Sequence, residues 1–366
     1  MKILSLIALL AVTFMAHAGD GTRWVSGDEF PLLGKGIDPA SSEFRYQRLP
    51  DSMKSIVKRD FVYFLGTNSA GMAIRFASDS PFIKARWKSR HNVSMHHMTP
   101  IGIRGLDLYS LEGDSTWVSV NSATPSMSGP NNETTIIAHM KPEMREYMLY
   151  LSLYDGVDSL YIGVDENSTL AQPSGLLTET VEPVVFYGTS LLQGGCANRP
   201  GMAHTNILRR RMNRDMINFG FSGNGQLDLE IAEVLAAVPN PAMYVLDFVP
   251  NVSDEQIDTL MVPFVEILEA AHPGIPMLFV EDPMFTQARL DTRMHDEVTR
   301  RNGLMKAQYE KLAARFPNLY YLPGGEIIGH DNEASVDGLH YTDVGFMRYS
   351  DLLEPVLRNI LAKKSK

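Results

Sequence analysis

The chain has 366 residues, more than a single hydrophobic core usually holds, so we expect two domains. Its formal net charge of −10 argues against nucleic acids and anionic membrane surfaces as partners, because both bind basic protein faces. With 44% hydrophobic and 21% charged residues, the composition is that of an ordinary soluble globular protein and argues against a disordered chain.

Residues 1–18 have the pattern of a secretory signal peptide. One positive charge, Lys2, precedes an apolar run that ends in the cleavage pattern Ala16-His17-Ala18. The run is too short to span a membrane comfortably, and no later stretch approaches the roughly 20 apolar residues that a spanning helix needs. We therefore expect an exported protein, periplasmic or secreted, without a membrane span. Its single cysteine, Cys196, excludes an intramolecular disulfide.

Alternating apolar and polar residues predict β-strands in the next part of the chain. Residues 72–76 and 83–87 each place apolar side chains on one side of a strand. The turn cluster Ser78–Pro81 between them is of the kind that joins hairpin strands. Further strand segments are predicted at 105–109, 115–120, 147–154 and 159–164. Short strands at roughly ten-residue spacing favour an all-β sandwich or jelly-roll domain over residues 19–175.

Three histidines of this region, His91, His96 and His97, raise the question of a metal site. Adjacent residues of a strand point to opposite faces, so His96 and His97 would not both bind one ion. Ordinary strand packing is the favoured interpretation. The alternative is a loop that reaches toward the cleft of the neighbouring domain and brings one histidine to the substrate. We predict no metal and no cofactor.

Strands alternate with helices after Pro183, which is the pattern of a parallel sheet covered on both faces. Strands are predicted at 184–187, 216–219, 243–248, 277–281 and 319–322. Helices are predicted at 203–213, 228–237, 253–271, 288–315 and 342–363. Ser253 and Gln256 have capping-box spacing at the start of the third of these helices. The prediction is a three-layer α/β/α domain with a five-stranded parallel sheet over residues 176–366.

Ser190 is the first candidate for chemistry. It follows the strand 184–187 in the turn Gly188-Thr189-Ser190, at the carboxyl end of the sheet, where α/β proteins place their sites. A serine in a turn is by itself weak evidence, because most such serines only stabilise the turn or cap a helix. The hypothesis that Ser190 is a nucleophile therefore depends on further signals in the same domain.

Two further signals follow the second and third strands. Gly223 lies in a glycine-rich loop and lacks a Cβ, so its backbone N–H can approach a substrate oxygen closely. Asn251 lies just past the third strand, where its side-chain amide could donate to an oxyanion. The alternative interpretations are a plain βα loop for Gly223 and a cap of the following helix for Asn251.

The last signal is Asp337-Gly338-Leu339-His340, just before the final helix. In a tight turn, residues three apart can bring the Asp337 carboxylate to Nδ1 of His340, which leaves Nε2 facing a serine. Triads are defined by geometry and roles, so the order of Ser190, Asp337 and His340 along the chain is no objection.

Together these motifs resemble the SGNH (GDSL-like) hydrolases, over roughly residues 180–362. The first block has Thr189 where Asp is more common, and Gly223, Asn251 and the Asp337/His340 pair fall at the second, third and fifth blocks. The resemblance implies a flavodoxin-like catalytic domain. The strings at 194–202 and 221–225 further resemble a subgroup preceded by a β-sandwich, whose members look like exported esterases of polysaccharide-degrading bacteria.

The resemblance implies a role for each motif residue. His340, oriented by Asp337, would take the proton of Ser190, which attacks an ester carbonyl. The backbone N–H groups of Ser190 and Gly223 and the side chain of Asn251 would hold the oxyanion. The expected activity is an esterase that removes short acyl groups, O-acetyl in particular, from carbohydrate, so that the partner is an acylated carbohydrate.

Several alternatives stay open at this point. The enzyme could be a lipid esterase such as a lysophospholipase, or the protein a non-catalytic glycan-binding protein on a hydrolase scaffold. Cys196 as a thiol nucleophile is disfavoured, because nothing in the flanking sequence indicates a lowered pKa. Gln193 and Arg199 could equally line the pocket or lie on the surface, and the pair Glu281-Asp282 could lie at the rim of the site. Substrate-binding residues and the oligomeric state are not predicted.

Overall fold

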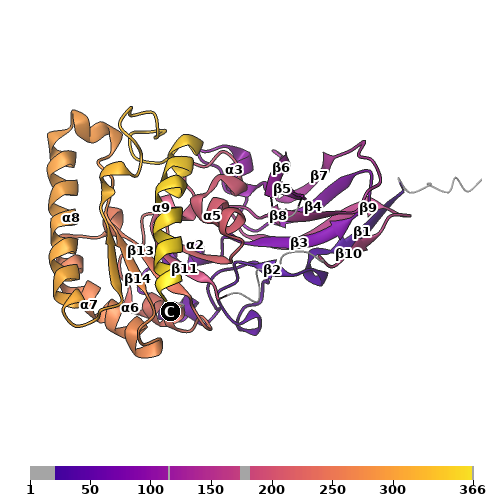
Figure 1. Ribbon diagram of the computed structural model, residues 1–366. Coiled ribbons are helices and arrows are strands. Elements are labelled where there is room, and N and C mark those ends of the chain that lie inside the picture. Colours follow the sequence, from indigo (N-terminus) through magenta and orange to yellow (C-terminus); the bar gives the residue numbers. More distant parts are fainter. Residues whose placement is uncertain (1–20, 114–115, 174–181, 365–366) are drawn as a thin grey trace, which may run out of the picture.

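The computed structural model describes residues 21–113, 116–173 and 182–364. The predicted signal peptide lies outside these residues and stays a prediction, as do the exact domain boundaries. The described part is elongated, with a β-rich domain at one end and an α/β domain at the other (Figure 1). Within it, no helix is both long enough and apolar enough to cross a membrane.

Two antiparallel sheets form the N-terminal domain. The first has the order β1 (Thr22–Ser26), β9 (Val157–Asp165), β4 (Ile83–Ser89) and β7 (Asn131–Ile137). The second has the order β10 (Leu170–Ala171), β3 (Ala73–Ser78), β8 (Arg145–Tyr150), β5 (Leu106–Glu112) and β6 (Thr116–Ala123), and β2 (Leu32–Leu33) also pairs with β3. Buried side chains of both sheets meet in one core, so the predicted sandwich is confirmed.

The turn cluster Ser78–Pro81 does not join a hairpin, which corrects the sequence prediction. β3 pairs with β2, β8 and β10 in one sheet, whereas β4 pairs with β7 and β9 in the other. The turn therefore carries the chain from one layer of the sandwich to the other. Turn chemistry shows where a strand ends, but the pairing of the strand depends on contacts with strands far along the chain.

The second sheet of the sandwich is covered on both faces. Every residue of β3 is buried, whereas β4 alternates between buried and less buried positions. On the outer face, Tyr109, Met148 and Tyr150 form a small cluster that meets the α/β domain, where the Tyr150 hydroxyl donates to the Asn206 carbonyl at 3.2 Å. This face is therefore the contact between the two domains.

A segment before β3 also packs on the α/β domain. It carries α1 (Met53–Ile56) and α2 (Asp60–Gly66), which the sequence analysis did not predict. Leu49 and Leu65 share a core cluster with Val185 and Phe219 of the parallel sheet. The core of the α/β domain therefore includes residues from the N-terminal part of the chain.

The α/β domain contains a five-stranded parallel sheet, as predicted. Its order is β12 (Met216–Gly220), β11 (Val184–Gly188), β13 (Met243–Asp247), β14 (Met277–Val280) and β15 (Leu319–Leu322). All four neighbouring pairs are parallel. Alternate residues of β11 face opposite sides, with Val184 and Phe186 in one core cluster and Val185 and Tyr187 in the other.

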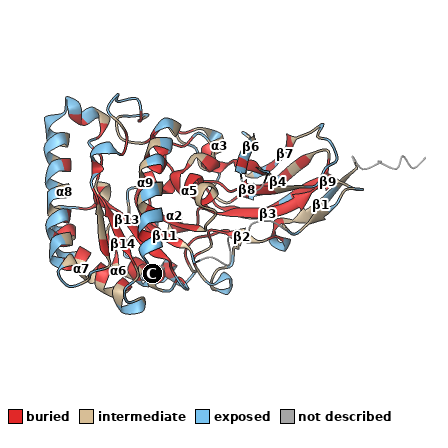
Figure 2. Cartoon of the chain, in the orientation of Figure 1, coloured by how far each residue is buried: buried red, intermediate tan, exposed pale blue. Residues whose placement is uncertain are grey.

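Helices cover both faces of this sheet. One face carries α5 (His204–Met212) and α9 (Asp343–Lys364), and the other carries α6 (Leu229–Ala236), α7 (Asp254–Ala271) and α8 (Thr292–Ala313). Figure 2 shows the exposed outer surfaces of α8 and α9 and the buried strands between the helical layers. The three-layer fold class is therefore confirmed.

Local signals set the ends of two of these helices. The Ser253 hydroxyl and the Gln256 side chain form the predicted capping box of α7. The predicted helix 288–315 instead begins at Thr292, because the Asp291 side chain accepts a hydrogen bond from Met294 N and caps α8 there. The short helices are α3 (Pro100–Arg104), α4 (Ser190–Gln193), η1 (Gly27–Glu29), η2 (Pro39–Ser41), η3 (Pro200–Met202), η4 (Val249–Asn251), η5 (Thr286–Arg289) and η6 (Gly324–Glu326).

Candidate active site

Ser190 lies where β11 ends and α4 begins. Gly188 pairs with Asp247 in the neighbouring strand, and a Cβ at position 188 would lie 2.2 Å from the Asp247 carbonyl oxygen. Thr189 is the N-cap of α4, and Ser190 is its first residue. The tight end of the strand therefore places the Ser190 side chain at the carboxyl edge of the sheet, as the sequence predicts.

The structure brings Ser190 together with His340 and Asp337. Ser190 Oγ lies 3.0 Å from His340 Nε2, and His340 Nδ1 lies 2.8 Å from Asp337 Oδ2. The His340 side chain is 24% exposed and the Asp337 side chain 38% exposed, so the group is open to solvent on one side. This is the geometry of a nucleophile, a base and an orienting carboxylate.

The turn that carries Asp337 and His340 holds the carboxylate in place. Asp337 Oδ1 accepts backbone hydrogen bonds from Leu339 N at 3.1 Å and His340 N at 2.8 Å. Gly338 has a φ of +89°, which glycine adopts without strain. Burial by itself would raise the pKa of Asp337, but the hydrogen bonds from the His340 side chain and backbone lower this pKa below its ordinary value. The carboxylate is therefore ionised at neutral pH.

The predicted oxyanion donors lie on the segments that follow β12 and β13, the two strands that flank β11 in the sheet. Gly223 has a φ of +68°, and apart from its two chain neighbours no described residue lies within 4 Å of where its Cβ would be, so the side of the backbone where a Cβ would stand is open. Asn251 Oδ1 accepts a hydrogen bond from Gly225 N at 3.2 Å. Because the amide oxygen is engaged, the NH₂ group of Asn251 is the end left for another acceptor. The cap of α7 is Ser253, so the interpretation of Asn251 as that cap is wrong.

The chain resembles known proteins over most of its length. The family model of the GDSL-like lipase/acylhydrolase family matches residues 181–358, and the model of the N-terminus of SGNH-hydrolase-type esterases, GxDLY, matches residues 22–170. A crystal structure of a protein from Bacteroides ovatus, named as a GDSL-like lipase, is 33% identical with a TM-score of 0.87. The match covers 93% of this chain and 98% of that chain. The chain belongs to the SGNH (GDSL-like) hydrolase family.

Two more distant structures share the fold of this SGNH hydrolase. The salicylyl-acyltransferase SsfX3 from a tetracycline biosynthetic pathway is 15% identical with a TM-score of 0.70. A family two carbohydrate esterase from Cellvibrio japonicus is 11% identical with a TM-score of 0.56. Each match covers 93% of this chain and 98% of the other. A search of the curated proteins gave no match.

The GxDLY pattern occurs here as Gly105-Leu106-Asp107-Leu108-Tyr109, and it ties the SGNH domain to the sandwich. The fully buried Asp107 accepts hydrogen bonds from Arg199 at 2.7 Å and from Gly201 N at 2.8 Å. Burial raises the pKa of Asp107, although Arg199 opposes this. The sequence leaves open whether Arg199 lines the pocket or lies on the surface. In the structure it anchors the segment after the nucleophile helix to the sandwich.

Two arginines from the N-terminal part hold the end of β12 and the loop after it, which carries Gly223. The buried guanidinium of Arg48 donates to the carbonyl oxygens of Asn218 at 3.0 Å and Gly220 at 2.7 Å. Arg59 donates to the carbonyl oxygen of Asn224 at 3.1 Å and to the Asp228 carboxylate at 2.7 Å. Sequence reasoning missed these residues, because an arginine that caps distant carbonyl groups leaves no local pattern.

The side chain of Gln193 also serves the loops around the site. It is fully buried, accepts a hydrogen bond from Ser222 N at 3.0 Å and donates to Asn68 Oδ1 at 3.0 Å. Tyr154 of the sandwich donates to the Ser190 carbonyl at 3.3 Å. Neither interpretation of Gln193 from sequence is right, because it neither lines an open pocket nor lies on the surface.

His97 reaches the candidate site from the other domain. Residues 90–99 contain no strand, so the favoured interpretation of ordinary strand packing is wrong. The ring centre of His97 lies 5.6 Å from that of His340, while His91 contacts Thr67 and Phe64 elsewhere. Thr99 near the end of this loop donates to the carbonyl oxygen of Asn198. The structure therefore has the loop of the alternative interpretation, which reaches the neighbouring domain, and the contact of one histidine with the substrate stays a prediction.

Acidic groups are buried beneath the catalytic edge. Asp247 at the end of β13 accepts a hydrogen bond from the Tyr349 hydroxyl at 2.8 Å, and burial raises the pKa of Asp247 to about 6. Burial and the nearby Asp247 raise the pKa of Asp282 well above its usual value. Glu281 accepts a hydrogen bond from Gly324 N at 3.0 Å. Because Asp282 is 3% exposed, it does not lie on an open rim of the site.

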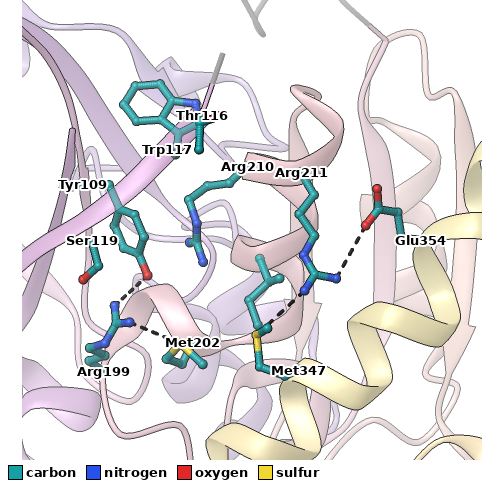
Figure 3. Close-up of a pocket in the computed structure, with 11 residues that line it drawn as sticks. Tyr109, Thr116, Trp117, Ser119, Arg199, Met202, Arg210, Arg211, Met347 and Glu354 are labelled. Carbon is teal, nitrogen blue, oxygen red and sulfur yellow. Dashed lines mark hydrogen bonds and ion pairs between the residues drawn. The ribbon is translucent and has the colours of Figure 1, made fainter. Parts of the chain in front are cut away.

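A cavity of about 690 Å³ lies between the two domains, and Ser190, Asp337 and His340 do not line it (Figure 3). Arg199 is paired with Asp107, and Arg211 is paired with Asp351 and Glu354. Arg210 stacks over the Tyr109 ring at 4.0 Å and donates to the Gly201 carbonyl. Arg199 and Arg210 therefore serve the contact between the domains, whereas Arg211 joins α5 to α9 within the α/β domain.

Proposed function

We propose that this SGNH hydrolase is a serine esterase that removes short acyl groups, O-acetyl in particular, from carbohydrate. The observation that supports it most is the array of Ser190, His340 and Asp337, with contacts of 3.0 Å and 2.8 Å at the carboxyl edge of the sheet. Gly223 and Asn251, on the segments after the two strands that flank β11, would supply donors of the type that acyl transfer requires.

The proposed reaction has two stages. His340 Nε2 takes the proton of Ser190 Oγ as the oxygen attacks the ester carbonyl, and then returns it to the leaving alcohol. Water, activated by the same nitrogen, releases the acid from the acyl-enzyme. Asp337 stabilises the imidazolium that forms, and the N–H groups of Ser190 and Gly223 with the Asn251 amide hold the oxyanion.

Carbohydrate as the substrate class is supported by the likeness to the Cellvibrio japonicus carbohydrate esterase. That likeness concerns the fold, and the fold is shared with an acyltransferase, so the acceptor of the acyl group needs its own test. A lipid esterase would instead need room for a long acyl chain beside Ser190.

The test compares esters of one alcohol that differ only in acyl length. We expect p-nitrophenyl acetate to be hydrolysed with a much higher kcat/KM than esters of eight or more carbons. Acetate release from acetylated xylan, pectin and sialic acids then identifies the carbohydrate. A preference for long chains would support the lipid esterase. A hydrolysis rate at background in both wild type and Ser190→Ala would support a non-catalytic glycan-binding protein.

We also propose that the protein is exported, on the basis of the signal-peptide pattern in residues 1–18. Expression with the native N-terminus should give a mature chain that begins at Gly19 in the periplasmic or extracellular fraction. N-terminal sequencing of that fraction is the measurement, and a cytoplasmic chain that retains Met1 would contradict export.

A further inference from the structure

Three side chains with metal-binding atoms converge beside the proposed triad. One ligand atom from each of His97, Cys196 and His340 lies within 4.8 Å of the other two. They come from three segments that are distant in sequence, namely the loop between β4 and α3, the segment after α4 and the turn before α9. Tertiary packing alone brings them together.

Two of these groups have no task in the proposed ester hydrolysis. His97 Nδ1 is buried and has no hydrogen-bond partner among the described residues. The Cys196 thiol is buried, and its sulfur makes no hydrogen bond to any described residue, whereas its backbone N–H donates to the Tyr341 carbonyl at 3.1 Å. A buried imidazole nitrogen without a hydrogen-bond partner raises the free energy of the folded protein. A metal ion bound to this nitrogen would remove that penalty.

The types of ligand select the ion. A thiolate and two imidazoles suit Zn²⁺, whereas Mg²⁺ and Ca²⁺ prefer oxygen ligands. Zinc–ligand bonds of about 2.0–2.3 Å require these atoms to approach by roughly 1 Å from their present separation. His97 lies on a loop without strand pairing, which allows such a movement. Burial and, to a smaller extent, the Asp337 carboxylate raise the pKa of the Cys196 thiol to about 12, so the metal has to displace a proton from a neutral thiol. The same carboxylate also interacts electrostatically with His97 and adds negative charge beside a divalent cation.

We propose that His97, Cys196 and His340 form a Zn²⁺ site whose occupation switches the hydrolase off. The thiol proton leaves to solvent when sulfur binds the metal, and water fills the fourth position. His340 loses a triad contact in either orientation, because Nε2 faces Ser190 and Nδ1 faces Asp337. Zinc binding and general-base catalysis therefore exclude each other.

The first experiment measures binding without relying on turnover. The mature full-length chain is freed of metal with a chelator, desalted and titrated with Co²⁺, a spectroscopic substitute for Zn²⁺. We expect a thiolate-to-cobalt charge-transfer band that saturates near one equivalent and disappears when Zn²⁺ is added. Ser190→Ala should show the same band, because the serine is not a ligand in this proposal.

Variants then locate the site. Cys196→Ser should abolish the band, and His97→Gln should weaken Zn²⁺ binding at least tenfold in calorimetry. His96→Gln is the matched control, since His96 is exposed on the same loop with its ring centre 4.8 Å from that of His97. Circular dichroism verifies folding, and the partly exposed His97 offers a second test should the buried Cys196→Ser variant misfold.

The predicted inhibition by Zn²⁺ rests on the proposed esterase function, whereas the predicted cobalt spectrum does not. With p-nitrophenyl acetate we expect micromolar Zn²⁺ to inhibit reversibly, with recovery on adding a chelator, and each variant is compared with its own zinc-free rate. His97→Gln should raise the inhibitory concentration at least tenfold. A cobalt band in a protein without esterase activity would overturn the function and keep the site. The absence of a band, or equal binding by wild type and His97→Gln, would overturn the site.

Discussion

Asp107 in the sandwich and Arg199 in the SGNH domain form an ion pair at 2.7 Å, with the aspartate fully buried. The pair fixes the segment that follows the nucleophile helix to β5. Tyr154 makes a second contact of this kind, because its hydroxyl donates to the Ser190 carbonyl. The sandwich is therefore part of the scaffold that positions the candidate site.

Removing the cation of this pair should destabilise the protein. In Arg199→Gln the Asp107 carboxylate stays buried with fewer partners, and we expect a loss of up to about 3–5 kcal/mol, measured by urea denaturation. Arg315→Gln is the control, since the Arg315–Glu266 pair is about half exposed and should cost less than about 1 kcal/mol. Equal effects of the two substitutions would show that the buried pair does not anchor the domains.

Asp337→Asn should reduce kcat strongly with little change in folding. The amide oxygen can still accept backbone hydrogen bonds, but the charge that stabilises the imidazolium is lost, so we expect a fall of about 10³–10⁴ in kcat. Steady-state kinetics with p-nitrophenyl acetate measures this effect. A variant with wild-type kcat would remove Asp337 from the proposed mechanism.

Asn251→Ala should reduce kcat by about 10²–10³ with a smaller change in KM, because an oxyanion donor acts mainly in the transition state. Asn251→Asp is the informative companion. The introduced carboxylate can still accept the hydrogen bond from Gly225 N, but it places a negative charge where the oxyanion forms. We therefore expect kcat to fall at least as far as in Asn251→Ala. If Asn251→Asp retained full activity, the side chain would serve only the loop.

Asp247→Asn should make the stability less dependent on pH. Burial raises the pKa of Asp247 from 3.8 to about 6, so the folded protein binds this proton more readily than the unfolded chain. The group therefore stabilises the fold as the pH falls from about 7 to 4, and its buried charge costs roughly 3 kcal/mol above that range. The variant should gain stability at pH 8 and lose this advantage by pH 4.

Several titratable groups interact with Asp247 and can contribute to the pH dependence of stability. They are Tyr341 and Tyr349 near α9 and Asp282 after β14, which in turn interacts with Glu281 and Arg301. Asp282→Asn is the companion variant, because burial shifts its pKa in the same direction. Urea denaturation of both variants and wild type at pH 4, 6 and 8 gives the measurement. A constant difference between Asp247→Asn and wild type would contradict the prediction.

Sequence patterns predicted the secondary structure well where short-range physics decides it. The strands β11, β14 and β15 are apolar runs, and the α7 capping box needs only residues three apart. The Asp337–His340 contact is likewise local, within one turn. The Ser78–Pro81 turn was misinterpreted because the layer that a strand joins depends on distant partners. The favoured interpretation of His91, His96 and His97 as ordinary strand packing was wrong, because residues 90–99 form a loop whose His97 packs against the other domain.

By itself, the sequence determined the fold class and the residue types available for chemistry, because periodicity, caps and turn residues act over a few positions. The tertiary structure alone decided that Ser190 meets His340 and that Arg48, Arg59 and Tyr154 support the loops around them. It also decided that His97 and Cys196 lie beside the same imidazole. Such contacts join residues far apart in the chain, and their geometry follows from how whole sheets and helices pack.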